Sequence, residues 1–200
     1  DDLEELAKTI LYPCTYQKQG CNEKYSLKEI KSHRTECQFR EYVCPTRQLE
    51  NCLWYGPKKN LKDHIRQSHN LKLKVQSNYS IVTFPNDRLQ NLEAYYYFCV
   101  FAHDEVFFRR FTIRDGYLCG YVQYIGPENK ASQYAYILDF RNPNGLEKFK
   151  VKHMVLSIQD NIDSFVEASK CFRVPYDYMR NFMDLEHNLI RFRLKIKKLK

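Results

Sequence analysis

Two successive sets of four cysteine and histidine residues dominate the first part of this 200-residue chain. The first set is Cys14, Cys21, His33 and Cys37, and the second is Cys44, Cys52, His64 and His69. In both sets eleven residues separate the second cysteine from the first histidine. Four nitrogen and sulfur donors complete a tetrahedral zinc site and leave no position for water or substrate. The sequence therefore predicts two structural zinc ions.

The second half of each set has the spacing of a helix. Apolar residues and ligands recur at intervals that place them on one helix face. These positions are Leu27, Ile30, His33 and Cys37 in the first set and Leu61, His64 and Ile65 in the second. Proline, glycine or asparagine stands beside the cysteines in the first half of each set, which indicates turns. Each set therefore predicts a turn-rich segment that faces a short helix.

Disulfide bonds are the alternative use of these cysteines. A disulfide framework is typical of secreted chains, but each set contains histidine at ligand spacing, and no secretory signal is visible. We therefore interpret both sets as zinc sites. Segments this small bury little apolar surface, so metal binding supplies their folding free energy, about 10–16 kcal/mol in isolated finger peptides.

The amino-acid composition bears on several possible classes of function. The chain has a formal net charge of +8, 16 tyrosines, 13 phenylalanines and only 6 glycines. The aromatic content suits β-structure, and the few glycines leave no glycine-rich loop to hold phosphate. No apolar run approaches the length of a membrane span. The positive charge raises the possibility of nucleic-acid binding, but residues 191–197 alternate apolar and basic residues, which indicates a strand with a solvated cationic face.

From residue 71 onward the pattern is a succession of β-rich runs separated by turn signals, which favours an antiparallel sandwich. The runs are Leu71–Val75, Ile81–Phe84, Ala94–Ala102, Val106–Ile113, Leu118–Ile125, Tyr134–Phe140, Phe149–Ile158, Cys171–Val174 and Leu189–Ile196. Two short helices are expected as well, one over residues 3–11 and one over Asp160–Ala168.

No constellation in this chain indicates catalysis. Cys99, Cys119 and Cys171 stand inside predicted strands, where a buried core thiol is the expected role. Neither a nucleophile elbow nor a zincin motif nor a phosphate-binding loop occurs. We therefore expect no catalytic residues here.

Several motifs together resemble the substrate-binding region of the seven-in-absentia (SIAH/SINA) E3 ubiquitin ligase family. In the zinc part they are Leu11–Cys14, Gly20–Cys21, His33 with Cys37, Phe39–Pro45, Trp54 with Gly56, and His64 with His69. In the β part, the segments Phe98–His103, Val122–Gly126, Tyr134–Leu138 and Ser169–Cys171 follow in the family's order. The zinc pattern with Phe39–Pro45 is the specific part of the likeness.

The resemblance implies a mostly β chain, in which two small structural zinc fingers precede an antiparallel TRAF-like β-sandwich. It divides the chain into a lead-in helix (1–11), zinc finger 1 (12–41), zinc finger 2 (42–70) and a substrate-binding sandwich (71–200). In that family an upstream RING domain binds the ubiquitin-charged E2, and the sandwich dimerises and captures targets. The parent protein would accordingly be a RING-type ubiquitin transferase that acts in the cytoplasm or the nucleus.

The implied capture mode is addition of an extended peptide to a sandwich edge, for ubiquitination and proteasomal degradation of the target. By position, the family's peptide groove falls on Leu73, Val75, Leu92, Tyr95 and Tyr97. Residues 91–97 replace a more aliphatic stretch of the family, which implies a different peptide preference. Packing of Tyr95 and Tyr97 inside the sandwich is the alternative.

Two other functions remain open. A TRAF-like adaptor or scaffold without ligase activity would share the fold. A zinc-finger nucleic-acid binder would fit the charge and the ligands of the second set, but its cysteines are spaced by two to four residues, whereas seven residues separate Cys44 from Cys52. We therefore expect protein targets and a homodimer, an E2 only through an upstream RING, and neither nucleic acid nor membrane as partners.

Overall fold

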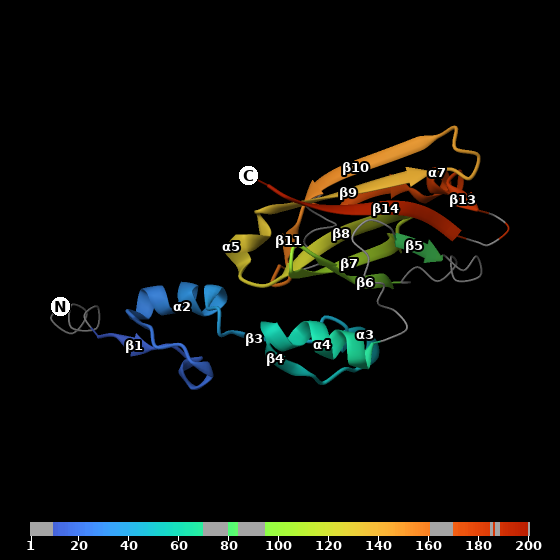
Figure 1. Ribbon diagram of the computed structural model, residues 1–200. Coiled ribbons are helices and arrows are strands. Elements are labelled where there is room, and N and C mark those ends of the chain that lie inside the picture. The colour runs from blue at the N-terminus through green and yellow to red at the C-terminus, as the bar shows by residue number, and fades with distance from the viewer. Residues whose placement is uncertain are drawn as a thin grey trace.

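The computed structural model describes residues 10–69, 80–83, 95–160, 170–184, 186 and 189–199. Over these residues, two small ligand-bearing modules lie beside a pair of packed sheets (Figure 1). The expected strand Leu71–Val75 lies outside the described residues, as do residues 3–9 and 161–168 of the two expected helices. Among the described residues, no helix is long and apolar enough to cross a membrane.

Finger 1 is built from a two-stranded ribbon and one helix. The ribbon pairs β1 (Tyr12–Pro13) with β2 (Lys24–Tyr25), with a 3-10 turn (Gln17–Gln19) between them, and the helix is α2 (Leu27–Glu36). Ser26 begins α2 with a capping box, because its hydroxyl accepts from the Glu29 N–H and the Glu29 carboxylate accepts from the Ser26 N–H. This start fixes the helix so that Ile30 is buried and His33 lies on the ligand side.

Finger 2 repeats this plan. Its ribbon pairs β3 (Glu41–Val43) with β4 (Tyr55–Pro57), α3 (Arg47–Glu50) lies between these strands, and α4 (Lys58–Ser68) follows. Leu61 and Ile65 are completely buried, one turn apart on the same face of α4. His69 lies just past the helix at its C-cap, and its N–H donates to the Ile65 carbonyl.

The remaining strands form two five-stranded sheets. Sheet I has the order β10-β9-β14-β13, with β5 also on β14, and sheet II has the order β11-β8-β7-β6, with β12 also on β8. Sheet I contains β5 (Ser80–Thr83), β9 (Tyr134–Arg141), β10 (Lys148–Met154), β13 (Met183–Asp184) and β14 (Leu189–Lys198). Sheet II contains β6 (Tyr95–Ala102), β7 (Glu105–Arg114), β8 (Tyr117–Ile125), β11 (Leu156–Ser157) and β12 (Phe172–Pro175). Two short helices, α5 (Glu128–Ala131) and α7 (Tyr176–Arg180), lie between strands. The described strands thus form the predicted mostly antiparallel β architecture.

Two tight hairpins set the register of sheet II. Asp115 and Gly116 both have positive φ, which is the two-residue turn that an Asp-Gly pair favours. His103 and Asp104 make the same kind of turn between β6 and β7, at φ of 52° and 61°. The sequence signalled the first turn and not the second, because histidine is not a usual turn residue.

The sequence predicted one strand over Phe149–Ile158, and this prediction is wrong. The strand breaks at Val155, whose N–H donates to Tyr134 of sheet I, and β11 then pairs with β8 of sheet II. The β11–β8 pair is parallel, unlike the other described strand pairs. The chain crosses here from one sheet to the other, which an apolar alternation cannot reveal.

The main core lies between the two sheets. Phe107, Phe111, Tyr136, Phe140 and Leu138 are among its fully buried members. Gly120 is required at its position, because a Cβ there would come within 2.4 Å of the rings of Phe111 and Phe172. Tight aromatic packing of this kind explains the high phenylalanine and tyrosine content.

Sheet II is buried on both faces, whereas sheet I has one exposed face. Residues 106–113 of β7 are all buried, which is the near-continuous burial of a strand covered on both sides. In sheet I, β14 alternates buried Phe192, Leu194 and Ile196 with exposed Arg193, Lys195 and Lys197. Finger 2 covers part of one of the two faces of sheet II.

Candidate metal centres and the surface they support

The structure brings each predicted ligand set together. The ligand atoms of Cys14, Cys21, His33 and Cys37 lie within 4.8 Å of one another, and so do those of Cys44, Cys52, His64 and His69. Within the described residues, these are the two groups of side chains arranged to hold a metal ion. In each finger the two cysteines at the start of the set lie beside the ribbon strands or in the turn between them, the next ligand lies inside the following helix, and the last is its C-cap residue.

The distances between ligand atoms fit a tetrahedral zinc ion. Bonds of about 2.3 Å to sulfur and about 2.0–2.1 Å to nitrogen give edges of about 3.8 Å between sulfurs, about 3.5–3.6 Å between sulfur and nitrogen, and about 3.3–3.4 Å between nitrogens. In finger 1, the Cys14–Cys37 Sγ atoms are 3.8 Å apart, and Cys21 Sγ lies 3.5 Å from His33 Nε2. Both distances match the edges of a zinc tetrahedron, and all four donor atoms lie within 4.8 Å of one another.

The second set has a similar arrangement with slightly shorter distances between sulfur and nitrogen. Cys44 Sγ lies 3.3 Å from His69 Nε2, and Cys52 Sγ lies 3.4 Å from His64 Nε2. The two Nε2 atoms are 3.3 Å apart. All eight cysteines of the chain are free thiols, so the disulfide interpretation does not hold. Four protein donors surround each centre, and the zinc ions are therefore structural.

Neighbouring side chains orient the histidine ligands of finger 2. His69 Nδ1 contacts Glu50 Oε2 at 2.5 Å, and His64 Nδ1 contacts Ser68 Oγ at 3.2 Å. A hydrogen bond at Nδ1 holds the imidazole with Nε2 free for the metal. The Trp54 ring stacks on His64 at 4.5 Å between centroids. In finger 1 Tyr25 stacks on His33 at 4.3 Å.

Burial adjusts the protonation of the ligands. Burial, with a smaller contribution from His69, lowers the pKa of His64 and favours the neutral imidazole that zinc needs. Burial raises the pKa of Cys37 to about 12 and that of Cys44 above its usual value. A zinc ion must therefore displace a proton from each of these thiols as it binds.

Finger 2 packs directly on sheet II. Tyr42, Leu61 and Ile65 of the finger join one buried cluster with residues of the sheet. The sheet residues of this cluster are Cys99, Phe101, Val106, Phe108 and Ile125. They occupy the face of the sheet opposite the main core, since strand residues alternate between faces. The finger and the sandwich thus share a hydrophobic core.

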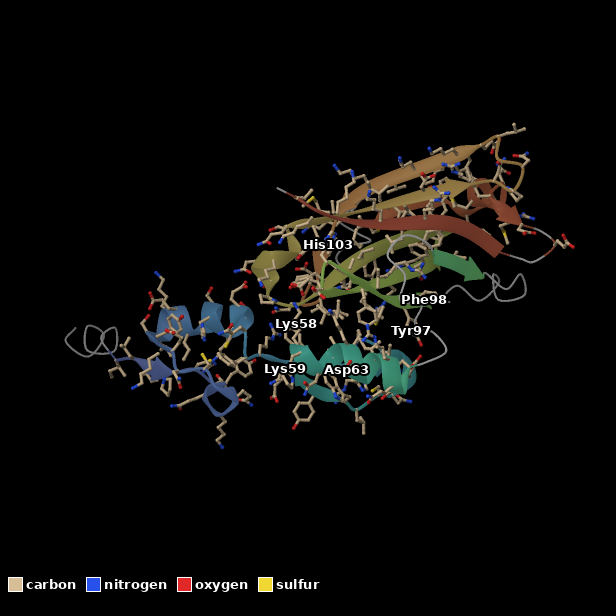
Figure 2. All side chains as sticks on the ribbon, in the orientation of Figure 1. Lys58, Lys59, Asp63, Tyr97, Phe98 and His103 are labelled. Atoms are coloured by element: carbon tan, nitrogen blue, oxygen red, sulfur yellow. The ribbon has the colours of Figure 1, made fainter. Side chains whose placement is uncertain are left out.

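Polar contacts surround this shared core. The Lys58 ammonium pairs with Glu105 and donates to the Tyr124 hydroxyl at 2.6 Å, and Lys62 pairs with Asp104 at 3.3 Å. Burial lowers the pKa of Lys58, and the contact with Glu105 opposes this shift. Figure 2 shows Lys58 and Tyr97 at different points along the boundary between α4 and the sheet.

Glu50 connects the second zinc site to the sandwich. One of its carboxylate oxygens contacts His69, and the other accepts from the Tyr97 hydroxyl at 2.6 Å. The side chain of Tyr97, expected in the peptide groove, therefore contacts finger 2. No sequence signal identified Glu50, because a glutamate in a short surface helix has no distinctive pattern.

The other predicted groove residues are described only in part or not at all. Leu73, Val75 and Leu92 lie outside the described residues, and Tyr95 is placed in β6 without a description of its side chain. Among the described strands, β6 and β10 each pair on one side and end their sheets.

The three cysteines outside the ligand sets are buried. Cys119 and Cys171 lie together in one small buried cluster with Tyr121, and Cys99 belongs to the core shared with finger 2. The His103 ring contacts the Ile196 carbonyl at 3.0 Å. These positions agree with structural roles.

Finger 1 has a smaller contact with the sandwich. The Glu36 carboxylate at the end of α2 accepts from the Asn129 N–H of α5 at 3.0 Å. The buried cluster of finger 1 consists of its own cysteines, with Tyr16 and Phe39 packed against them.

Comparison with known proteins agrees with this architecture. Residues 5–82 match the family described as "Sina, zinc finger", and residues 96–194 match the one described as "Sina, TRAF-like domain". The chain is 24% identical over 179 residues to "E3 ubiquitin-protein ligase sina" of Schistosoma mansoni, covering 84% of this chain and 46% of that protein. It is 24% identical over 194 residues to the protein of the same name in Drosophila virilis, covering 91% and 58%.

A shorter similarity has a higher identity. Over 67 residues the chain is 33% identical to "E3 ubiquitin-protein ligase siah2" of Xenopus laevis, which covers 34% of this chain and 21% of that protein. The chain spans about half the length of the two sina relatives. The structure brings both ligand sets together, and the two domain matches follow in the expected order. The chain therefore belongs to the seven-in-absentia (SIAH/SINA) family.

Proposed function

We propose that this chain is the target-recognition part of a ubiquitin ligase, and that it holds proteins for ubiquitination and degradation. The observation that carries the proposal is the match of both halves of the chain to one family, whose relatives are named E3 ubiquitin-protein ligases. An E2 would be bound by a RING elsewhere in the parent protein, which would act in the cytoplasm or the nucleus.

The chemical contribution of such a chain is proximity. A target held on the sandwich has one or more lysines near the E2, so ubiquitin transfer proceeds at a high effective concentration. This role needs a rigid platform and no catalytic side chain. The core shared by finger 2 and sheet II supports such a platform, because it joins the two modules by packing as well as by the chain.

The proposed capture mode is strand addition at the edge of β6. No described strand pairs with the outer side of β6, so the edge offers backbone N–H and C=O groups to an extended peptide. Tyr95 and Tyr97 lie on this strand. Because the Tyr97 hydroxyl donates to Glu50, its backbone rather than its ring would contact the peptide. Leu73, Val75 and Leu92 would supply the side-chain pockets.

We expect the sandwich to form a homodimer, as the resemblance implies. Light scattering of the zinc-loaded chain at micromolar concentrations tests this expectation, and a monomer at the highest concentration contradicts it.

Selection from a random peptide library on the zinc-loaded chain tests the capture mode. Enriched peptides should slow hydrogen exchange of alternate backbone amides within Tyr95–Ala102, because an added strand hydrogen-bonds alternate residues. Scrambled peptides are the control. The parent protein, supplied with E1 and E2, should then ubiquitinate a reporter that bears an enriched peptide. Enriched peptides that leave the β6 amides unprotected exclude strand addition at this edge, and a parent protein without ligase activity excludes the wider proposal.

A further inference from the structure

Basic side chains from three strands meet on the exposed face of sheet I. Seven of them lie on the outer positions of β9, β10 and β14: Arg141, Lys148, Lys150, Lys152, Arg193, Lys195 and Lys197. All seven are exposed, and Asp139 is the one carboxylate on the outer positions of β9, β10 and β14 among the described residues. Figure 2 shows nitrogen-tipped side chains along the outer side of β9 and β10.

The pairing register orders these cations into rows. Lys148 is opposite Arg141 on β9, Lys150 and Arg193 flank Asp139, and Lys152 and Lys195 flank Ile137. Along one strand, successive outer positions are about 6.6–6.8 Å apart, and β10 and β14 are separated by two strand spacings, about 9.6 Å. The face is therefore a regular array of positive charge.

This array is unfavourable for the isolated chain. Like charges directly opposite each other in a sheet destabilise it, and Lys148 faces Arg141. Asp139 relieves only part of this repulsion, through contacts of 3.6 Å to Arg141, 3.8 Å to Lys148 and 4.0 Å to Lys150. Ion pairs of this length whose cationic partners are exposed contribute little. A negatively charged partner would relieve the repulsion.

We propose that this face, and the edge of β10 beside it, bind an extended acidic segment of a partner protein. A strand added to β10 would place alternate side chains about 5 Å from Lys148, Lys150 and Lys152, which is the distance of cross-strand pairs. Alternate glutamates or aspartates in the segment would match these three lysines in spacing and in sign. No described strand covers the outer edge of β10.

Two other occupants fit this face less well. A second copy of the chain would bring an identical cationic face against it, which electrostatic repulsion opposes. Binding of single-stranded nucleic acid uses aromatic rings beside the cations, and no described aromatic ring stands on the outer positions of these three strands. Asp139 would also repel a phosphate chain laid across the middle of the face.

The site is separate from the edge of β6, which lies in the other sheet. It therefore does not depend on strand addition at β6, and the two proposals can fail independently. Lysines on an edge strand also discourage aggregation. The test must therefore distinguish binding of a specific partner from this general effect on solubility.

The test measures binding of the zinc-loaded chain to a short peptide with glutamate at every second position. A peptide of the same composition, with its glutamates in one block, is the matched control, and duplex and single-stranded DNA are the competing ligands. At about 50 mM salt, where exposed charges are weakly screened, we expect the alternating peptide to bind about tenfold more tightly than the block peptide. It should also protect β10 amides from hydrogen exchange.

Variants locate the site. Lys150→Glu with Lys195→Glu should weaken binding of the alternating peptide by about tenfold or more, because both changes reverse charge on the face. Lys28→Glu with Lys59→Glu makes the same change in net charge at exposed positions in the fingers and should alter affinity less than about twofold. Asp139→Asn should strengthen binding about twofold to fivefold, since it removes the opposing carboxylate. Zinc content and melting temperature establish that each variant is folded.

Equal affinity for both peptides, or an equal loss in the two charge-reversal variants, overturns the proposal in favour of general electrostatic attraction. Tighter binding of DNA that is lost with Lys150→Glu and Lys195→Glu overturns it in favour of a nucleic-acid surface. Absence of binding to the alternating peptide also overturns it.

Discussion

The two zinc fingers have almost the same ligand layout and very different neighbours. In finger 1, the buried cluster is made of its own cysteines with Tyr16 and Phe39, and a Glu36–Asn129 hydrogen bond reaches the sandwich. In finger 2, Leu61, Ile65 and Tyr42 belong to a cluster that continues into sheet II. A shared metal motif therefore fixes the local structure of each finger, whereas the apolar residues between the ligands determine which other part of the protein the finger packs against.

The difference has a structural consequence for the sandwich. Sheet II would expose Phe101, Val106 and Phe108 if finger 2 were unfolded, because the finger packs over them. No described contact gives finger 1 a comparable role. Four measurements can test this contrast between the two fingers.

Loss of one zinc ligand in each finger gives the largest contrast. We expect Cys44→Ser to release one zinc ion and unfold finger 2, since metal binding supplies about 10–16 kcal/mol in finger peptides. Melting of the sandwich should then occur at a clearly lower temperature, with aggregation from the uncovered face. Cys14→Ser should also release one zinc ion but leave the main melting transition nearly unchanged. Metal analysis with differential scanning calorimetry checks both, and similar melting of the two variants would contradict the contrast.

Removal of one buried aliphatic side chain from each finger tests the shared core without touching the metal. Leu61 is completely buried, and Leu61→Ala should lower the free energy of unfolding of the finger 2–sandwich unit by about 2–5 kcal/mol. Ile30→Ala in finger 1 is the matched change and should destabilise finger 1 alone. Urea unfolding followed by aromatic fluorescence provides the measurement. A sandwich equally sensitive to both substitutions would show that finger 1 is also coupled to it.

The polar contacts around the shared core should have a smaller effect. Lys58→Met leaves Glu105 and the Tyr124 hydroxyl without this partner and should cost about 1–3 kcal/mol. Tyr97→Phe removes the hydrogen bond to Glu50 and should cost about 0.5–1.5 kcal/mol. Lys28→Met, at an exposed position of α2, is the control and should have almost no effect on unfolding. Stability of Lys58→Met equal to that of this control would show that the Lys58 contacts do not hold the finger.

The affinity of the two fingers for zinc should depend differently on pH, because zinc binding releases one more proton from finger 1 than from finger 2. Finger 1 binds zinc through three cysteines and finger 2 through two. Between the ordinary pKa of histidine, about 6.5, and that of the thiols, about 8.5, histidine is neutral and the thiols are protonated. Because burial raises the pKa of Cys37 to about 12, its proton must be displaced throughout this window.

The affinity of each finger should therefore fall as pH falls, and the fall should be steeper for finger 1. The logarithm of zinc affinity should change by about three per pH unit for finger 1 and about two for finger 2. Competition with a chromophoric chelator, with Cys14→Ser and Cys44→Ser used to isolate one site at a time, measures both slopes. Equal slopes would show that one finger 1 cysteine keeps its proton in the complex.

The sequence was most informative where spacing alone defines chemistry. The repeated eleven-residue gaps identified both ligand sets, and the distances between Nε2 and Sγ atoms fit two zinc ions. The mostly β architecture and the family were also confirmed. The Asp115–Gly116 turn followed from residues with a known backbone preference.

The sequence was least informative where distant segments meet. The crossover at Val155 was missed, because an apolar alternation continues through it even though the hydrogen-bond partners change sheet. Glu50 was missed because its two partners, His69 and Tyr97, lie 19 and 47 residues away. The predicted groove residues Leu73, Val75 and Leu92 remain predictions.

Residue spacing was sufficient to define two tetrahedral sites, because ligand chemistry and helix periodicity act over short stretches of chain. It also determined that β14 has one apolar and one cationic side. Two features became visible only in the folded chain: finger 2 and sheet II share a core, and the lysines of β10 lie on the same face as those of β14. Strand order and module packing depend on contacts between residues far apart in the chain, and a local sequence pattern does not indicate which apolar faces will pack together.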